Sequence, residues 1–185
     1  MKTRCLAILV FAASASLAAW AVDIDGRIGP AEYAFSQVLA KDTFTLHWRI
    51  EGDRIHLAME ALSKGWVSLG FDPGAVMARS DMLFGLVAEG GKTEAVDAWC
   101  TGTFGPHPAD VDQGGRGDLL AWAGSRSGDR VVFECTRLLD TKDKFDKVIV
   151  PGAEMKLIWA TGRDLVFTSK HAKAGAAKLR FEAAK

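Results

Sequence analysis

Cysteine is scarce in this sequence, net charge is absent, and the common catalytic motifs are missing. The three cysteines form no CxxC or CxxCH motif, so covalent cofactor attachment through such a motif is excluded. The 23 Lys and Arg residues balance 23 Asp and Glu residues, which argues against a nucleic-acid partner, because phosphates require a basic face. GxSxG, HExxH and Walker-type loops do not occur, and only four histidines are available as bases or ligands. We therefore expect a protein that is not an enzyme.

The first 21 residues have the layout of a secretory signal peptide. Lys2 and Arg4 precede an apolar run over residues 6–20, and an A-x-A-like cleavage signal follows at its end. The run is short for a membrane span, although an uncleaved anchor is the alternative. We expect residues 1–21 to be removed on export, leaving residues 22–185 as one periplasmic or secreted domain without a membrane span.

Two cysteines, Cys100 and Cys135, remain after the expected cleavage. An oxidising compartment would allow a disulfide between them, but sequence alone does not show whether their side chains meet. Both occur in apolar, strand-like stretches, where free buried thiols are equally ordinary. Both alternatives stay open at this point.

Apolar and polar residues alternate with a period of two along most of the chain. This period predicts half-buried strands at residues 44–50 and 55–59, joined by a turn at residues 51–54. Further strands are predicted at residues 66–71, 81–88, 95–100, 118–123, 130–136, 155–160 and 178–182. Short segments rich in Gly, Asp and Pro separate them, and no long helix is expected. The pattern predicts an all-β fold, a single-domain antiparallel β-sandwich of about nine to eleven strands.

The histidines differ in their context. His47 and His56 occupy polar faces of predicted strands, where surface positions are expected. His107 belongs to the irregular segment 101–117, and a loop of that length in a compact domain is usually functional or disordered. His171 lies between two predicted strands, where position alone does not distinguish a ligand from a surface residue.

The methionines differ in the same way. Met59 occupies an apolar strand face and is expected in the core, and Met82 and Met155 begin apolar strands. Met77 instead lies in the connection 73–81, outside any alternating pattern. It is either a ligand or an adaptable side chain that fills a gap in the core.

Residues 66–71 (WVSLGF) followed by residues 77–81 (MARSD) strongly resemble the DOMON domain family. That family has a W-x-x-x-G-F strand, a short Gly-containing loop and an M-x-x-x-D start of the next strand. Further segments match in the same order, at residues 25–33, 101–108, 136–141, 158–162 and 169–171. The resemblance covers nearly all of the expected mature chain, and it implies a β-sandwich that binds haem or, in other branches, sugars.

In the haem-binding branch, which includes the cytochrome domain of cellobiose dehydrogenase, a loop Met and a His near the C-terminal end hold the iron. The matching residues here are Met77 and His171, so the resemblance implies that they are the metal ligands of one non-covalent haem b. Thioether and imidazole together saturate the iron, which favours electron transfer over catalysis. The implied partner is a redox protein or a membrane electron carrier.

Several details of the implied site stay open. The family also has members with a Lys as second ligand, so the alternatives to His171 are Lys170, Lys173 and His107. Trp66 and Phe71 are expected to wall the cofactor.

We also expect roles for one aspartate and two arginines near this site, and two other functions compete with haem binding. Asp81 is expected to hold the loop of Met77 through backbone amides, and Arg79 and Arg163 are candidate partners of the haem propionates. The competing functions are a haem-free module that binds a sugar or another small ligand through its tryptophans, and a structural or interaction domain.

Overall fold

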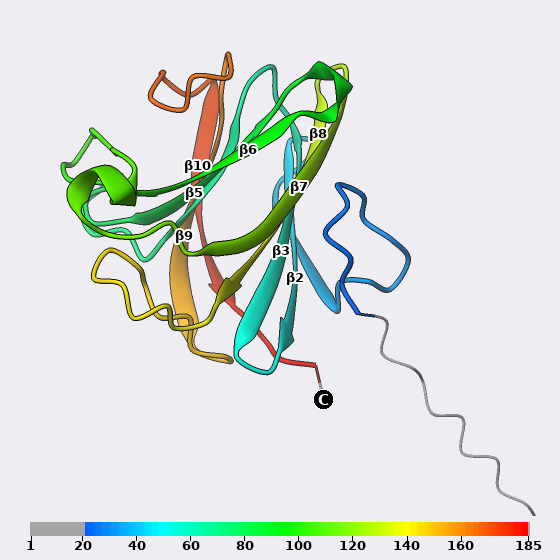
Figure 1. The fold of residues 1–185 in the computed structure, drawn as a ribbon, viewed down its shortest axis with the longest axis horizontal. Helices are drawn as coiled ribbons and strands as arrows, with labels where there is room; N and C mark the ends of the chain where they lie inside the picture. The colour runs from blue at the N-terminus through cyan, green and yellow to red at the C-terminus, as the bar shows by residue number, and fades with distance from the viewer. Residues whose placement is uncertain (1–20, 185) are drawn as a thin grey trace, which may run out of the picture.

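The computed structural model describes residues 21–184, so the expected signal peptide lies outside the described residues except for Ala21. Ten strands form two five-stranded antiparallel sheets that pack face to face (Figure 1). The first sheet has the order β1 (Phe35–Ala40), β2 (Phe44–Glu51), β3 (Arg54–Leu62), β8 (Arg130–Leu138) and β7 (Leu119–Ser127). The second has the order β10 (Lys173–Arg180), β9 (Glu154–Thr161), β4 (Val67–Phe71), β5 (Asp81–Val87) and β6 (Thr93–Trp99). The predicted all-β sandwich is confirmed.

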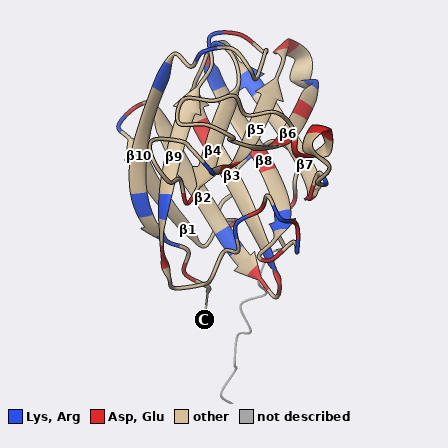
Figure 2. Ribbon diagram, turned by 90° about the vertical axis from the view of Figure 1, so that its left-hand side faces the viewer, with Lys and Arg blue, Asp and Glu red and all other residues tan. Residues whose placement is uncertain are grey.

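Two short 3-10 turns complete the described elements, η1 (Glu89–Gly91) and η2 (Asp110–Gln113). Among residues 21–184 there is no helix with the length and apolarity needed to cross a membrane. Lys and Arg residues are interspersed with Asp and Glu residues over loops and strands (Figure 2), as the balanced charge of the sequence suggests.

The main core lies between the two sheets. Every second residue of β2, from Phe44 onward, faces inward and is buried, as the period-two pattern predicts. Met59 is fully buried there, as expected from its strand face. Gly85 permits a close approach between the two sheets, because a Cβ atom at this position would lie 2.2 Å from the Phe133 ring. A large aromatic side chain of the first sheet therefore packs directly on the backbone of the second.

Two edge strands, β1 in the first sheet and β10 in the second, differ from the prediction. β1 was not predicted, because its apolar side chains do not alternate; at the sheet edge, half of its residues are exposed and none is buried. β10 was predicted at residues 178–182 but pairs with β9 from Lys173 to Arg180. After Lys173, its first half contains only Ala and Gly, which carry no hydrophobic alternation.

The cysteines and two of the histidines are located by the packing. Cys100 and Cys135 are free and buried. They belong to different apolar clusters, so the structure favours the free-thiol alternative. The expectation of a surface position is wrong for His56, which is only 9% exposed, and His47 is partly buried, with 17% of its side chain exposed. This burial lowers the pKa of both imidazoles. The Tyr33 ring, from the segment before β1, packs near His47, with 6.1 Å between the ring centroids.

Candidate cofactor-binding cavity

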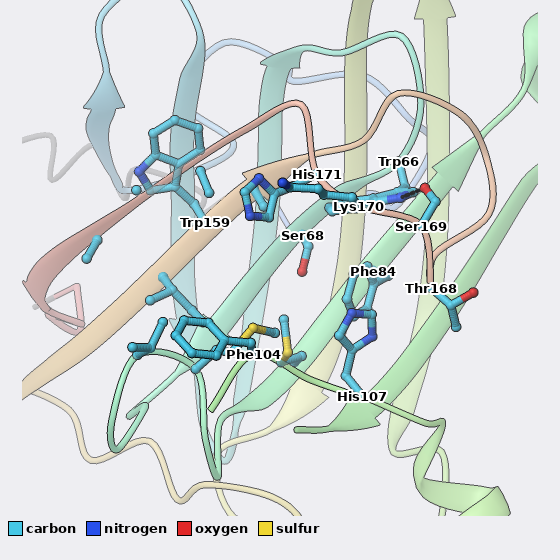
Figure 3. A pocket seen from close by; sticks show the side chains of 18 residues that line it. Trp66, Ser68, Phe84, Phe104, His107, Trp159, Thr168, Ser169, Lys170 and His171 are labelled. Carbon is cyan, nitrogen blue, oxygen red and sulfur yellow. Dashed lines mark hydrogen bonds between the residues drawn. The ribbon is translucent and has the colours of Figure 1, made fainter. Parts of the chain in front are cut away.

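A cavity of about 870 Å³ lies against the outer face of the second sheet (Figure 3). The middle strands β4 and β5 are buried on both faces, and their inward apolar residues belong to the main core. Outward-facing Met82 and Phe84 of β5 belong to a second apolar cluster, together with Trp66, which precedes β4. Outward-facing Ser68, Met82 and Phe84 line the cavity, together with Ile158 and Ala160 of β9. A sheet with two apolar faces must be shielded from water on each. On the outer face, the loops β4–β5 and β9–β10 and the segment after β6 do this, and the cavity lies between them and the sheet.

Aromatic rings form one end of the cavity. The Phe84 ring lies 5.2 Å from the Trp66 ring in an edge-on arrangement and 5.5 Å from the Phe167 ring. His107 stacks on Phe84 with ring centroids 5.0 Å apart. The Trp66 indole nitrogen also donates a hydrogen bond to the Ser169 hydroxyl at 3.4 Å. These rings join the sheet to two of the covering loops.

The loop between β4 and β5 carries Met77 to the cavity. Its neighbours Val76 and Arg79 have positive φ angles of 56° and 57°, so the loop turns sharply on both sides of Met77. The Met77 amide donates to the Thr103 carbonyl at 3.4 Å, and the Arg79 amide donates to the Cys100 carbonyl at 2.8 Å. These two bonds tie the loop to the segment that follows β6.

The segment that follows β6 carries His107. The Trp99 amide donates to the Pro108 carbonyl at 3.3 Å, and the Thr101 amide donates to the Pro106 carbonyl at 3.0 Å. The Nδ1 atom of His107 is buried and has no hydrogen-bond partner among residues 21–184. Burial lowers the pKa of this imidazole, which favours its neutral form. His107 is therefore a cavity-lining imidazole with one ring nitrogen that has no hydrogen-bond partner among the described residues.

The loop between β9 and β10 carries Lys170 and His171 to the cavity rim. Asp164 shapes this loop, because its carboxylate accepts hydrogen bonds from the Val166 amide at 2.9 Å and from the Ser169 hydroxyl at 2.8 Å. In Figure 3, His171 and Phe104 lie at opposite edges of the opening. Small residues follow His171 along β10 at the cavity wall: Ala174, Gly175 and Ala176.

Four of the five residues predicted for the site line this cavity: Met77, His171, Trp66 and His107. The prediction for Phe71 is wrong. Its side chain is fully buried in the main core, with its ring centroid 6.2 Å from that of Phe181. Since side chains alternate along a strand, Phe71 faces the opposite side of β4 from the cavity-lining Ser68.

The alternative ligands and partners are also separated by the structure. Lys170 lines the cavity, whereas Lys173 does not and directs its Nζ atom to the Thr43 hydroxyl at 3.4 Å. The candidate propionate partners Arg79 and Arg163 are not among the lining residues.

Asp81 does not hold the Met77 loop through its backbone amides, contrary to expectation. Its Oδ2 atom accepts hydrogen bonds from the Arg137 guanidinium and from the Lys147 amide, each at 2.8 Å. The side chain is thus directed into the sandwich and joins β5 to β8 and to the segment after β8. These partners are remote in sequence, so no local pattern indicates them.

The outward-facing Met82, Phe84 and Ile158 were not predicted as site residues. A signal for them exists in the sequence, since β5 is apolar at both alternating positions, which is typical of a strand covered on both faces. Phe104 was not predicted either, and its exposure of 84% places a large aromatic side chain at the cavity mouth.

Comparison with known proteins identifies the family. The sequence profile of the DOMON domain matches residues 40–162. DBH-like monooxygenase protein 1 of Mus musculus is 26% identical over 121 residues, which cover 65% of this chain and 19% of the relative. MOXD1 homolog 2 of Drosophila melanogaster is 29% identical over 119 residues, which cover 64% of this chain and 15% of the relative. The chain thus spans less than a fifth of the length of each of these relatives.

Two solved structures share the fold. The cytochrome domain of Myriococcum thermophilum cellobiose dehydrogenase superposes with a TM-score of 0.52 at 11% identity, covering 80% of this chain and 81% of that one. The cytochrome b domain of pyranose dehydrogenase from Coprinopsis cinerea gives 0.52 at 15% identity, covering 77% and 79%. At these identities the likeness shows a common fold, and the profile match over most of the sandwich shows that the chain belongs to the DOMON domain family.

Proposed function

We propose that the cavity binds one non-covalent haem b and that the domain transfers single electrons. The observation that carries the proposal is that Met77 and His171, from two loops far apart in sequence, line the same apolar cavity. A thioether and a neutral imidazole are an established pair of axial ligands for haem iron in electron-transfer proteins. Two structures with the same fold are cytochrome domains by their titles, which supports the proposal without carrying it.

The cavity fits a flat, largely apolar cofactor. Its volume of about 870 Å³ lies within the range of roughly 300–1,000 Å³ usual for cofactor and ligand pockets. Aromatic and aliphatic side chains form most of its lining, and the small residues of β10 leave one wall without protruding side chains. The polar groups are few and include both imidazoles, so the donor chemistry suits iron better than a hard cation.

The residues have distinct proposed roles. Met77 supplies a soft thioether, which favours ferrous iron and raises the reduction potential. Its loop is fixed by the bonds to Thr103 and Cys100, so we expect the sulfur to move little between oxidation states. His171 supplies the second ligand, on a loop shaped by Asp164. His107, whose buried Nδ1 atom has no partner among the described residues, is the alternative second ligand together with Lys170.

Bound haem would supply a one-electron ferric/ferrous couple. The protein would orient the ring between the two loops and exclude water through the cavity-lining rings of Trp66 and Phe84. Because both axial positions would be filled by side chains, we propose an electron carrier and not a catalyst. The partner would be a redox protein or a membrane electron carrier outside the cytoplasm, approaching the mouth where Phe104 is exposed.

Haem titration of the purified protein tests the proposal and assigns the second ligand. We expect one haem per chain and a six-coordinate, low-spin spectrum. His171→Ala should lose this spectrum and regain it with added imidazole, whereas His107→Ala and Lys170→Ala should retain it. A wild-type spectrum in His171→Ala, with loss in either other variant, would reassign the ligand. Failure of the wild-type protein to take up haem would refute the proposal.

A further inference from the structure

Three aspartates from distant segments meet inside the sandwich, away from the cavity. Asp81 begins β5, Asp97 lies in β6, and Asp146 belongs to the segment between β8 and β9. One carboxylate oxygen from each lies within 4.8 Å of the others, and all three side chains are almost fully buried. Asp81 and Asp97 face the core side of the second sheet, so the cluster and the cavity lie on opposite faces of that sheet.

The neighbouring protein groups do not satisfy these carboxylates. Arg137 and the Lys147 amide both donate to Asp81 Oδ2 at 2.8 Å, and Arg137 lies 3.4 Å from Asp146 Oδ2. The Asp118 amide donates to Asp97 Oδ2 at 2.9 Å. The Oδ1 atoms of Asp81, Asp97 and Asp146 are buried and have no hydrogen-bond partner among the described residues. Each aspartate therefore has an oxygen free to bind a ligand.

Asp110 provides an independent indication. This residue, on η2, is fully buried, and neither of its carboxylate oxygens has a hydrogen-bond partner within residues 21–184. Burial and the charges of Asp146 and Asp81 raise its pKa to about 7, so its carboxylate feels the cluster electrostatically. Burial and the neighbouring carboxylates also raise the pKa of Asp97 to about 8 and that of Asp146 to about 6. When all four carboxylates are ionised, one guanidinium does not balance them, and buried charges are normally paired or bound to metal.

We propose that Asp81, Asp97 and Asp146 bind a divalent cation of the calcium class, with Asp110 adding a further negative charge nearby. The donors are all oxygens, which hard cations prefer. Oxygens bound to calcium lie at about 2.3–2.6 Å, so two of them are at most roughly 4.6–5.2 Å apart across the ion. The three oxygens lie within 4.8 Å of one another, which is compatible with this limit. Magnesium usually keeps several waters and binds only one or two carboxylates, so a set of three carboxylates favours calcium. The ion would join β5, β6 and the segment after β8.

Terbium luminescence gives a direct test, because Trp99 lies opposite Asp81 in the pairing of β5 with β6. In protein stripped with EDTA, we expect added terbium to emit on excitation of tryptophan and calcium to displace it. Calcium at about 100 times its dissociation constant should raise the thermal midpoint by roughly 5–10 °C. No terbium emission together with no calcium-dependent midpoint would overturn the proposal.

Matched variants locate the binding. Asp97→Asn keeps the size of the side chain and an oxygen for the Asp118 amide, but it removes a charge from the cluster. This variant should weaken calcium binding at least about tenfold. The control Asp112→Asn changes an exposed aspartate of η2, the turn that carries Asp110, and should leave calcium binding unchanged. Equal calcium binding by wild type and Asp97→Asn would contradict the site, and so would a midpoint that responds to magnesium and not to calcium. Haem uptake is measured separately, so failure of one proposal does not imply failure of the other.

Discussion

Arg137→Met should destabilise the protein far more than the same change at Arg130, although both arginines lie on β8 and both pair with a carboxylate. The Arg137 side chain is 1% exposed and its Asp81 partner 0%, with 2.8 Å between nitrogen and oxygen. The Arg130 side chain is 63% exposed, and its Glu60 partner 34%, at 2.6 Å. Distance alone would therefore rank the two pairs as equals.

Burial determines the expected difference in the free energy of unfolding. Removing one partner of a buried ion pair leaves an uncompensated charge and costs about 3–5 kcal/mol. Arg137 also lies over the Phe71 ring at 5.5 Å and 3.4 Å from Asp146, so its loss leaves two carboxylates without their cation. For a domain of this size, the midpoint should fall by roughly 6–20 °C. Loss of an exposed pair costs at most about 1 kcal/mol.

Urea denaturation of wild type, Arg137→Met and Arg130→Met in EDTA measures both effects without a contribution from bound cations. We expect a large fall in the denaturation midpoint for Arg137→Met and almost none for Arg130→Met, with similar slopes. Equal losses in the two variants, or an unchanged midpoint for Arg137→Met, would refute the argument from burial.

Three further predictions concern the packing of Gly85 in the core, the pH dependence due to His56 and the reactivity of the two thiols. Gly85→Ala should cost about 1–3 kcal/mol of unfolding free energy, since the new methyl group would meet the Phe133 ring; chemical denaturation measures it. Burial lowers the pKa of His56, so the unfolded chain binds protons first as pH falls, and stability should decrease below about pH 6.5. His56→Gln should show a shallower decrease in parallel denaturation experiments. Cys100 and Cys135 should resist a thiol reagent in the native protein and react, two per mature chain, after denaturation.

Each of these predictions has a clear contrary result. Gly117→Ala serves as a control for the core, because nothing lies within 4 Å of a Cβ atom there, and an equal loss in both variants would contradict the packing argument. Identical pH profiles of wild type and His56→Gln would show that this histidine is not buried in its neutral form. Absence of reactive thiols after denaturation without reductant would indicate a disulfide.

Much of the fold follows from the sequence because hydrophobic alternation reports which face of a strand is buried. The strands β2 and β3 alternate clearly and were predicted within a few residues. Alternation is absent in β1, whose apolar residues do not repeat with a period of two, and in the first half of β10, where the residues after Lys173 are small. β1 was therefore missed and β10 was shifted. Burial of a polar strand face is equally invisible, which is why His56 was expected at the surface although it is buried beside Thr136 of β8, 2.8 Å from its hydroxyl.

The site depends on a different kind of information. Met77 and His171 were identified through resemblance to a family, since neither lies in an alternating pattern, and the structure brings both to one cavity. Phe71 was misplaced because nearness to a motif in sequence was preferred over the strand period, which directs it to the core. The acidic cluster around Asp81 joins three distant segments, so it becomes visible only when the sheets are assembled.

The optical spectrum of the reduced protein, recorded for wild type beside Met77→Leu, tests the central claim most directly. Leucine approximates the volume of methionine and lacks the sulfur, so the cavity should persist while one iron ligand is lost. We predict a six-coordinate low-spin haem spectrum for wild type and a changed coordination state with a lower reduction potential for Met77→Leu. Indistinguishable spectra and potentials, or a wild-type protein that stays colourless with ample haem, would contradict the account.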